Sequence, residues 1–336
     1  MFVQHFRITL LVVLFTFFIL SIFSLSIGEV FINPLDLISS IFSDNQYSLI
    51  VQNFRAPKTL TAILAGISLS VSGLLMQTLF RNPIAGPYIL GISSGASLGV
   101  SFVIMGASIF SGIQMLSDTS IVAGALLGSV LMILILLSIL KYVKDIMTLL
   151  IIGVMFGAFA SSLSSILQYF STDFQVKSFV LWTFGNLSNV NYSQLWIMFG
   201  FIILALILIL FSVKGLNILI LGNDNLSNFG INKRLLQVFI LISTAILTGV
   251  ITAFCGPIGF VGVVVPHFAR MLIKSSNHIF LLPITALMGA SLMLLSDIIS
   301  QIPSNGIILP INSVTAFIGI PFILWVLLKP SQKIRI

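Results

Sequence analysis

The chain has 336 residues, of which 58% are hydrophobic and only 7% charged, and its formal net charge is +7. A soluble domain carries about 25% charged residues, and a chain of this size could not bury so much apolar surface in a water-soluble core. The composition therefore excludes a soluble globular protein, and it predicts that the positive charge reflects membrane topology rather than nucleic-acid binding.

Apolar runs of about 20 residues are long enough to cross a bilayer as helices, and they lack the alternation that a membrane β-barrel would show. The first run follows Arg7 and has no clear cleavage site, so we interpret it as a retained span rather than a signal peptide. The sequence predicts an all-α polytopic membrane protein, with one transmembrane domain over residues 1–336. The ten expected spans are 8–27, 59–79, 88–107, 120–140, 147–169, 194–213, 235–254, 259–273, 280–299 and 311–328.

The basic residues indicate the orientation, because cytoplasmic loops collect Lys and Arg. With the N-terminus inside, three basic residues fall outside, namely Arg55, Lys58 and Lys177. Twelve fall on the cytoplasmic side: Arg7, Arg81, Lys141, Lys144, Lys214, Lys233, Arg234, Arg270, Lys274, Lys329, Lys333 and Arg335. An even number of spans then places both termini in the cytoplasm.

The second and third spans are joined by the turn Arg81–Pro87, and the third span carries Gly91, Gly95 and Gly99. Glycines four residues apart share one helix face and allow a neighbouring helix to approach closely. The fifth span has a similar stripe, which contains Gly153, Gly157, Ser161 and Ser165. This stripe has two readings: it packs against a helix, or it forms the wall of a wide and mildly polar pathway. Asn312, Ser313 and Thr315 at the start of the last span could line the same pathway.

The glycine-rich stretch Gly256–Arg270 lacks the preceding strand and the glycine order of a dinucleotide fingerprint. We interpret it as a tight re-entry between spans, which places His267 and Arg270 at the inner surface, where Arg270 can reach phosphates or water. Asp297 in the ninth span is the one acid close to a span interior. An intramembrane acid has two readings, a hydrogen-bonded structural group or a transport residue.

Catalytic motifs are missing from the sequence. It contains no phosphate-binding G-x-x-x-x-G-K-[ST] loop, no H-E-x-x-H and no G-x-S-x-G. His5, His267 and His278 do not have metal-ligand spacing, and the single cysteine, Cys255, excludes an internal disulfide. We therefore expect neither an enzyme nor a bound metal or cofactor.

Three stretches carry a resemblance to a known family. The segment "RAPKTLTAILAGISLSVSGLLMQTLFRNPIAGPYILGISSGASLG", from Arg55 to Gly99, resembles the signature of FecCD-type permeases. These are the membrane subunits of bacterial ABC importers for iron–siderophores, haem and vitamin B12. The later "CGPIGFVGVVVPHFARMLIKSSNHIFLLPITALMGASLMLLSDIIS" and "LPINSVTAFIGIPFILWVLL" match the same family in the same order, so the resemblance covers about residues 10–330.

The resemblance implies a ten-span subunit of the bacterial inner membrane that forms a homodimer or a pair with a close relative. Two copies of an ABC ATPase subunit would dock beneath it and a periplasmic substrate-binding protein above it. The pathway would lie between the two permease copies, lined by spans five and ten and by the short helix after span five. The missing phosphate-binding loop agrees with an ATPase on a separate chain, and an iron chelate is the expected substrate on family frequency.

The resemblance also implies roles for particular residues. The ATPase-coupling segment would lie at about 215–232, where Leu221, Gly222 and Gly230 match the family pattern, while Leu226 and Phe229 replace its usual alanine and leucine. Arg55 and Lys58 would sit on the outer face and dock the binding protein, and Gln301 stands where a vitamin B12 permease has a third basic residue. The cytoplasmic gate would comprise Asn82, Ile84, Asp145 and Ile146.

A second hypothesis remains open at this point. A secondary transporter driven by an ion gradient would need no ATPase, and it usually carries a buried acid in mid-membrane. Asp297 is the only candidate for that acid in the sequence.

Overall fold

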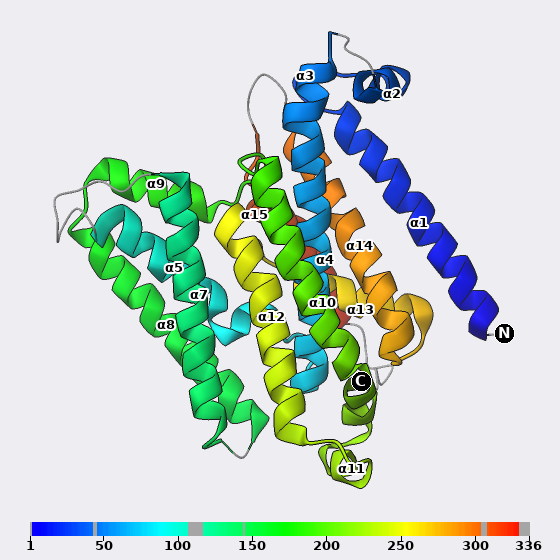
Figure 1. Cartoon of the computed structure of the whole chain (residues 1–336), viewed down its shortest axis with the longest axis vertical. Coiled ribbons are helices and arrows are strands. Elements are labelled where there is room, and N and C mark those ends of the chain that lie inside the picture. The colour runs from blue at the N-terminus through cyan, green and yellow to red at the C-terminus, as the bar shows by residue number, and fades with distance from the viewer. Residues whose placement is uncertain (1, 43–45, 107–116, 144, 304–307, 329–336) are drawn as a thin grey trace. The chain divides into compact units, whose positions relative to one another are not determined.

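Figure 1 shows a computed structural model of the chain, which describes residues 2–42, 46–106, 117–143, 145–303 and 308–328. All regular elements in these ranges are helical. With the labels of Figure 1, the α-helices are α1 (Phe2–Ser26), α2 (Pro34–Phe42), α3 (Ser48–Ile50), α4 (Ala56–Phe80), α5 (Ile92–Ser101), α7 (Asp118–Leu140), α8 (Ile146–Tyr169), α9 (Asp173–Thr183), α10 (Tyr192–Leu221), α11 (Asn223–Asn228), α12 (Lys233–Cys255), α13 (Val261–Ile273), α14 (His278–Ser300) and α15 (Ile311–Leu328). A 3-10 turn, η2 (Pro87–Leu90), precedes α5, and π-helical turns η1 (Val51–Arg55) and η3 (Phe102–Gly106) lie before α4 and after α5.

Seven helical segments are long and apolar enough to cross a membrane: Gln4–Ser26, Ser48–Phe80, Asp118–Leu140, Ile146–Tyr169, Tyr192–Leu221, Lys233–Cys255 and His278–Ser300. They coincide with seven of the ten expected spans, which confirms the all-α, multi-span class. The other three expected spans correspond to shorter apolar helices, Ile92–Gly106, Val261–Ile273 and Ile311–Val326. The count of ten spans and the cytoplasmic termini stay predictions. Of the residues that set the orientation, Lys144, Lys329, Lys333 and Arg335 lie outside the described ranges.

The chain divides into two compact units. Unit 1 comprises Met1–Leu74, Asn186–Gly200 and Ile258–Ile336, and unit 2 comprises Leu75–Gly185 and Phe201–Pro257. Both α4 and α10 run from one unit into the other, because Leu74 and Gly200 lie inside these helices. The single transmembrane domain stays a prediction, and each unit is described by itself below.

In unit 1, α1 packs along α14, as Figure 1 shows. The Phe6 and Phe280 rings meet edge to face with centroids 4.9 Å apart. Behind them lies a core cluster of Leu74, Ala269, Ile273, Leu281 and Ile284. Helix α13 has only 13 residues. At 1.5 Å per residue it is about 20 Å long, which is shorter than the ~30 Å hydrocarbon core of a bilayer.

In unit 2, α5 packs closely against α7. A Cβ atom added at Gly95 would lie 2.6 Å from the Gly128 carbonyl oxygen, and one at Gly99 would collide with the Gly124 carbonyl. Any larger residue at these positions would push the two helices apart. The predicted close-packing face is therefore confirmed for Gly95 and Gly99, and α7 is the helix that approaches it.

Gly91 differs from the expectation that it belongs to the same helical stripe. Its φ is +71°, a left-handed conformation, and it separates the 3-10 turn η2 from α5. Glycine adopts this conformation without the steric cost that other residues meet. Its α-carbon lies against Gly157 of α8. Gly91 is therefore a junction between two short helical pieces rather than a residue within one long span.

Candidate functional site

Arg55, expected on the outer face, is enclosed within unit 1 and only 8% exposed. Its Nη1 donates hydrogen bonds to the carbonyls of Leu25 (2.8 Å) and Ser26 (2.7 Å), and its Nη2 donates to the carbonyl of Val30. The last carbonyls of a helix have no partner within the helix, and a cation near them is favourable. Arg55 thus caps the end of α1, which differs from the expected exposed position.

Lys58 is also turned inward. Its Nζ lies 3.0 Å from Oδ1 of Asp297, and the two side chains are 13% and 3% exposed. Ser24 and Gln301 donate to the other carboxylate oxygen, at 3.1 Å and 3.2 Å. This polar cluster joins α1, α4 and α14, and it gives Asp297 the role of a hydrogen-bonded structural acid.

The two basic residues therefore do not present free charges on the surface of unit 1. Both groups have partners within unit 1: helix-end carbonyls bind Arg55, and the buried acid Asp297 binds Lys58. Sequence reasoning could not see these partners, since Asp297 is far from Lys58 along the chain. Whether the pair takes part in docking a partner is a separate prediction.

The serine stripe of α8 divides into two parts. Gly153 and Gly157 are buried against η2 and the start of α5, whereas Ser161 and Ser165 are exposed. The Ser161 hydroxyl donates to the Gly157 carbonyl (3.0 Å), and the Ser165 hydroxyl donates to the Ser161 carbonyl (3.1 Å). Packing against a neighbouring helix therefore fits the two glycines. The wall of a polar pathway fits the two exposed serines.

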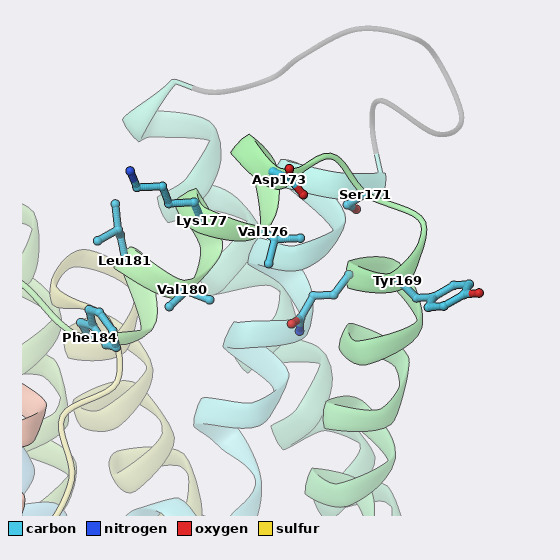
Figure 2. A pocket seen from close by; sticks show the side chains of 9 residues that line it. Tyr169, Ser171, Asp173, Val176, Lys177, Val180, Leu181 and Phe184 are labelled. Atoms are coloured by element: carbon cyan, nitrogen blue, oxygen red, sulfur yellow. The ribbon is translucent and has the colours of Figure 1, made fainter.

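Helix α9 follows α8 and begins with a capping box, in which the side chains of Thr172 and Gln175 satisfy each other's backbone N–H groups. Gln175 Nε2 also donates to the Ile104 carbonyl (3.0 Å), which fixes α9 over η3. A cavity of about 620 Å³ lies where α8 ends and α9 runs, lined by Gln168, Tyr169, Ser171, Asp173, Val176, Lys177, Val180, Leu181 and Phe184. In the view of Figure 2, Tyr169 and Lys177 extend to opposite sides.

This cavity has the volume of a small-molecule site, and it combines apolar side chains with a few polar ones. The sequence did not predict a binding site at the residues that line this cavity. The available signal was the length of the outer segment Ser171–Gln194, which is too long for a simple turn.

The predicted residues of the last span have different environments. Asn312 Oδ1 accepts a hydrogen bond from the Gly259 amide (2.9 Å), which ties α15 to the turn before α13. The Thr315 hydroxyl donates to the Asn312 carbonyl (3.0 Å), and Thr315 is buried. Only Ser313 is exposed. Asn312 therefore joins α15 to the turn before α13, whereas the Thr315 bond stays within α15. The pathway role of these residues stays a prediction.

The first candidate gate element is the turn between α4 and η2 in unit 2. Asn82 Oδ1 accepts a hydrogen bond from the Ile84 amide (3.0 Å). The Ile84 side chain is 42% exposed. Arg81 anchors the turn, because its Nη2 donates to the Leu219 carbonyl of α10. The second element is the start of α8, where Asp145 is the exposed residue that precedes the helix and Ile146 is its first residue. No hydrogen bond is described between these two elements.

The expected coupling segment forms a short helix between two glycine turns. Helix α10 ends at Leu221, Gly222 has a φ of +138°, α11 follows, and Gly230 has a φ of +68°. Leu226 is fully buried, whereas Leu221 and Phe229 are 69% and 57% exposed. Leu226 therefore packs inward, and Leu221 and Phe229 are the exposed apolar residues of this segment. The coupling role of the segment stays a prediction.

Within the described residues there is no cluster of three or more His, Cys, Asp or Glu side chains that could hold a metal ion.

Comparison with known proteins gives one consistent group. A sequence model described as the FecCD transport family matches residues 14–329. The vitamin B12 import system permease protein BtuC of Salmonella arizonae is 36% identical over 312 residues, which is 93% of this chain and 91% of BtuC. The hemin transport system permease protein HmuU of Yersinia pestis is 36% identical over 282 residues, 84% of each chain. A solved transporter assigned to the metal-chelate ABC type, in an inward-facing conformation, has a TM-score of 0.82 at 29% identity and covers 96% of this chain and 99% of that one.

Proposed function

The chain belongs to the FecCD transport family, and we propose that it is the transmembrane permease subunit of a bacterial ABC importer that takes up an iron chelate, such as a siderophore or haem, or cobalamin. The observation that carries this proposal is the family match over nearly the whole chain, supported by relatives named for vitamin B12 and hemin transport. The protein would lie in the inner membrane as a homodimer.

The energy source would be a partner. Because the sequence has no phosphate-binding loop, ATP hydrolysis would occur on two ATPase subunits, and a periplasmic binding protein would deliver the substrate. An ion-gradient transporter is not favoured. Its only candidate acid, Asp297, is held by Lys58, Ser24 and Gln301 in the structure, which supports a structural role.

Substrate would pass along the hydroxylated part of α8. Ser161 and Ser165 are exposed there, and the 620 Å³ cavity beside α9 lies at the C-terminal end of the same helix. Ser313 of α15 is a further pathway candidate because it is exposed. Asn312 and Thr315 would stabilise the start of α15 through their hydrogen bonds. The turn at Asn82 and Ile84 and the start of α8 at Asp145 and Ile146 would close the inner exit.

The segment 215–232 would couple ATP hydrolysis to transport. In this proposal Gly222 and Gly230 form the turns that present α11 as a rigid element, and Leu221 and Phe229 insert into the ATPase. Leu226 holds α11 to its own chain, which fits its complete burial.

Co-expression with the ATPase and the binding protein tests the function. The assembled importer in proteoliposomes should take up an iron chelate or cobalamin only when ATP is inside, and an imposed ion gradient without ATP should give no uptake. Uptake driven by the ion gradient alone would overturn the proposal.

Phe229→Glu tests the coupling surface within that assembly. Because Phe229 is exposed, we expect normal yield of the permease but at least a tenfold loss of ATPase association and transport. The matched control is Tyr142→Glu, which places the same charge at an aromatic residue that is 85% exposed on another loop. Equal association of the two variants would remove α11 from the ATPase interface.

A further inference from the structure

One end of unit 1 gathers positive charge. Helix α13 carries Arg270 in its last turn and ends before Lys274, and α14 begins at His278. The first turns of α1 carry His5 and Arg7. The surrounding sequence segments, residues 1–27 and 256–296, contain no aspartate or glutamate. The charge of this end is therefore not neutralised by neighbouring side chains of the same segments.

Two contacts bring these segments together. The Nε2 atom of His5 lies 2.9 Å from the Leu272 carbonyl oxygen, and the Phe6 ring packs on Phe280. The start of α1 therefore lies against both sides of the short connection between α13 and α14. Arg7 and Lys274, each two residues along the chain from one partner of the His5–Leu272 contact, are exposed.

A second set of polar groups lies on α13 and at the start of α14. His267 and Arg270 share one face of α13 because they are three residues apart. Arg270 is close enough to His267 and His278 to act electrostatically on each of them. His267 is 5% exposed, and its Nε2 has no hydrogen-bond partner among the described residues. Arg270 carries the permanent positive charge of this set, and it adds to the charges of Arg7 and Lys274.

The helices that carry these charges also expose apolar side chains. Ile8 and Leu11 of α1 and Ile279 of α14 are more than half exposed, and Met271 of α13 is 36% exposed. Arg7 and Leu11 are four residues apart and share a helix face. A ligand that places an anion at Arg7 and Lys274 would therefore lay any attached hydrocarbon on these side chains, and a free inorganic ion would leave them uncovered.

We propose that this end of unit 1 binds an acidic phospholipid, with the phosphate between Arg7 and Lys274 and the acyl chains along Ile8 and Leu11. Basic pockets at the ends of membrane helices recognise anionic headgroups in this way. His5 and Arg270 would shape the pocket from its sides. The proposal concerns lipid binding and does not depend on the transported substrate.

The test uses the full-length protein in a neutral detergent. Native mass spectrometry would measure retained lipid during titration with cardiolipin, with phosphatidylcholine as the zwitterionic comparison. The double variant Arg7→Gln/Lys274→Gln should bind cardiolipin about 25-fold more weakly, since each basic residue near an anionic lipid contributes roughly fivefold. The matched control is Lys141→Gln/Arg234→Gln, which removes one exposed lysine and one exposed arginine from unit 2 and should bind as the unmodified protein does.

Two further arms separate the lipid from other ligands. Inorganic phosphate at millimolar concentration should not displace cardiolipin, and displacement would show a site for the free anion instead. Cardiolipin binding that is equal in the double variant and the control would overturn the proposal. If that equality came with a loss of ATPase association in the double variant alone, the patch would be a protein-docking surface.

Discussion

Helices α1 and α8 are covered to a similar extent by the rest of the chain. In the apolar stretch of each helix, 17% of the α1 residues and 22% of the α8 residues are buried. Their exposed faces are nevertheless different. The exposed face of α1 consists mainly of large apolar residues such as Leu11, Phe15 and Phe18. The C-terminal half of α8 also exposes apolar residues such as Phe159 and Ile166, but it adds the hydroxyls of Ser161, Ser162 and Ser165. A hydroxyl gains nothing from a lipid environment, so exposure alone does not identify lipid contact. We therefore expect α1 to face lipid and the serines in the C-terminal half of α8 to face something more polar.

The largest effect should come from the buried side of α1, where Ser24 meets the Lys58–Asp297 pair. Lys58→Met leaves the Asp297 carboxylate buried without its cation, which should cost about 3–5 kcal/mol of stability. The measurement is the thermal midpoint of the purified protein in detergent. Lys58→Met/Asp297→Leu should recover most of the loss, because it removes both charges, and Lys177→Met at an exposed lysine should change little. A double variant as unstable as the single one would contradict a specific pairing.

The exposed face of α1 should tolerate a charge poorly. Phe15→Asp places an acid near the middle of a lipid-facing helix, at an expected cost of about 3 kcal/mol for insertion. We expect a clear loss of protein in the membrane fraction, with Phe15→Leu as the control. Ser165→Asp on α8 should insert more readily, because water or substrate would solvate it. Equal losses for the two acidic variants would remove the distinction between the faces.

The smallest effect on folding, with a specific effect on function, should come from the α8 serines. Ser161→Phe/Ser165→Phe should leave the membrane yield nearly normal while it reduces transport at least tenfold, since two rings would narrow a polar path. Val154→Phe, in the N-terminal half of α8 on the same face and 50% exposed, is the control. Ser165→Ala should change stability by less than about 1 kcal/mol, because its hydroxyl bonds only to the carbonyl one turn earlier. Transport at the control level in the double variant would place α8 against lipid.

Features set by the local sequence could be predicted well. The spans follow from continuous apolar runs, and the close approach at Gly95 and Gly99 follows from their four-residue spacing. The turn at Asn82 follows from its position before Pro83, since a residue before proline avoids helical geometry. The family assignment also rests on contiguous motifs that can be read directly.

Features set by pairing of distant segments could not be predicted in the same way. Nothing in the sequence near Lys58 indicates that it will form an ion pair with Asp297. Nothing near Arg55 indicates that it will donate hydrogen bonds to the carbonyls at the end of α1. The burial of Leu226 likewise depends on how α11 folds back on its own chain. Gly91 looked like one more member of a helical stripe, and only its backbone conformation shows that it ends one piece and begins another.

The Lys58–Asp297 pair has a consequence for biosynthesis. Asp297 is made about 240 residues after Lys58, which at roughly 5–20 residues per second is a delay of about 10–50 s. During that time α4 must reside in the bilayer with an ammonium group whose final partner does not yet exist. Arrival of α14 removes this cost and joins the first helix to one of the last. The pair is therefore a natural marker of completed synthesis, and chains truncated before α14 would expose an unpaired charge to membrane quality control.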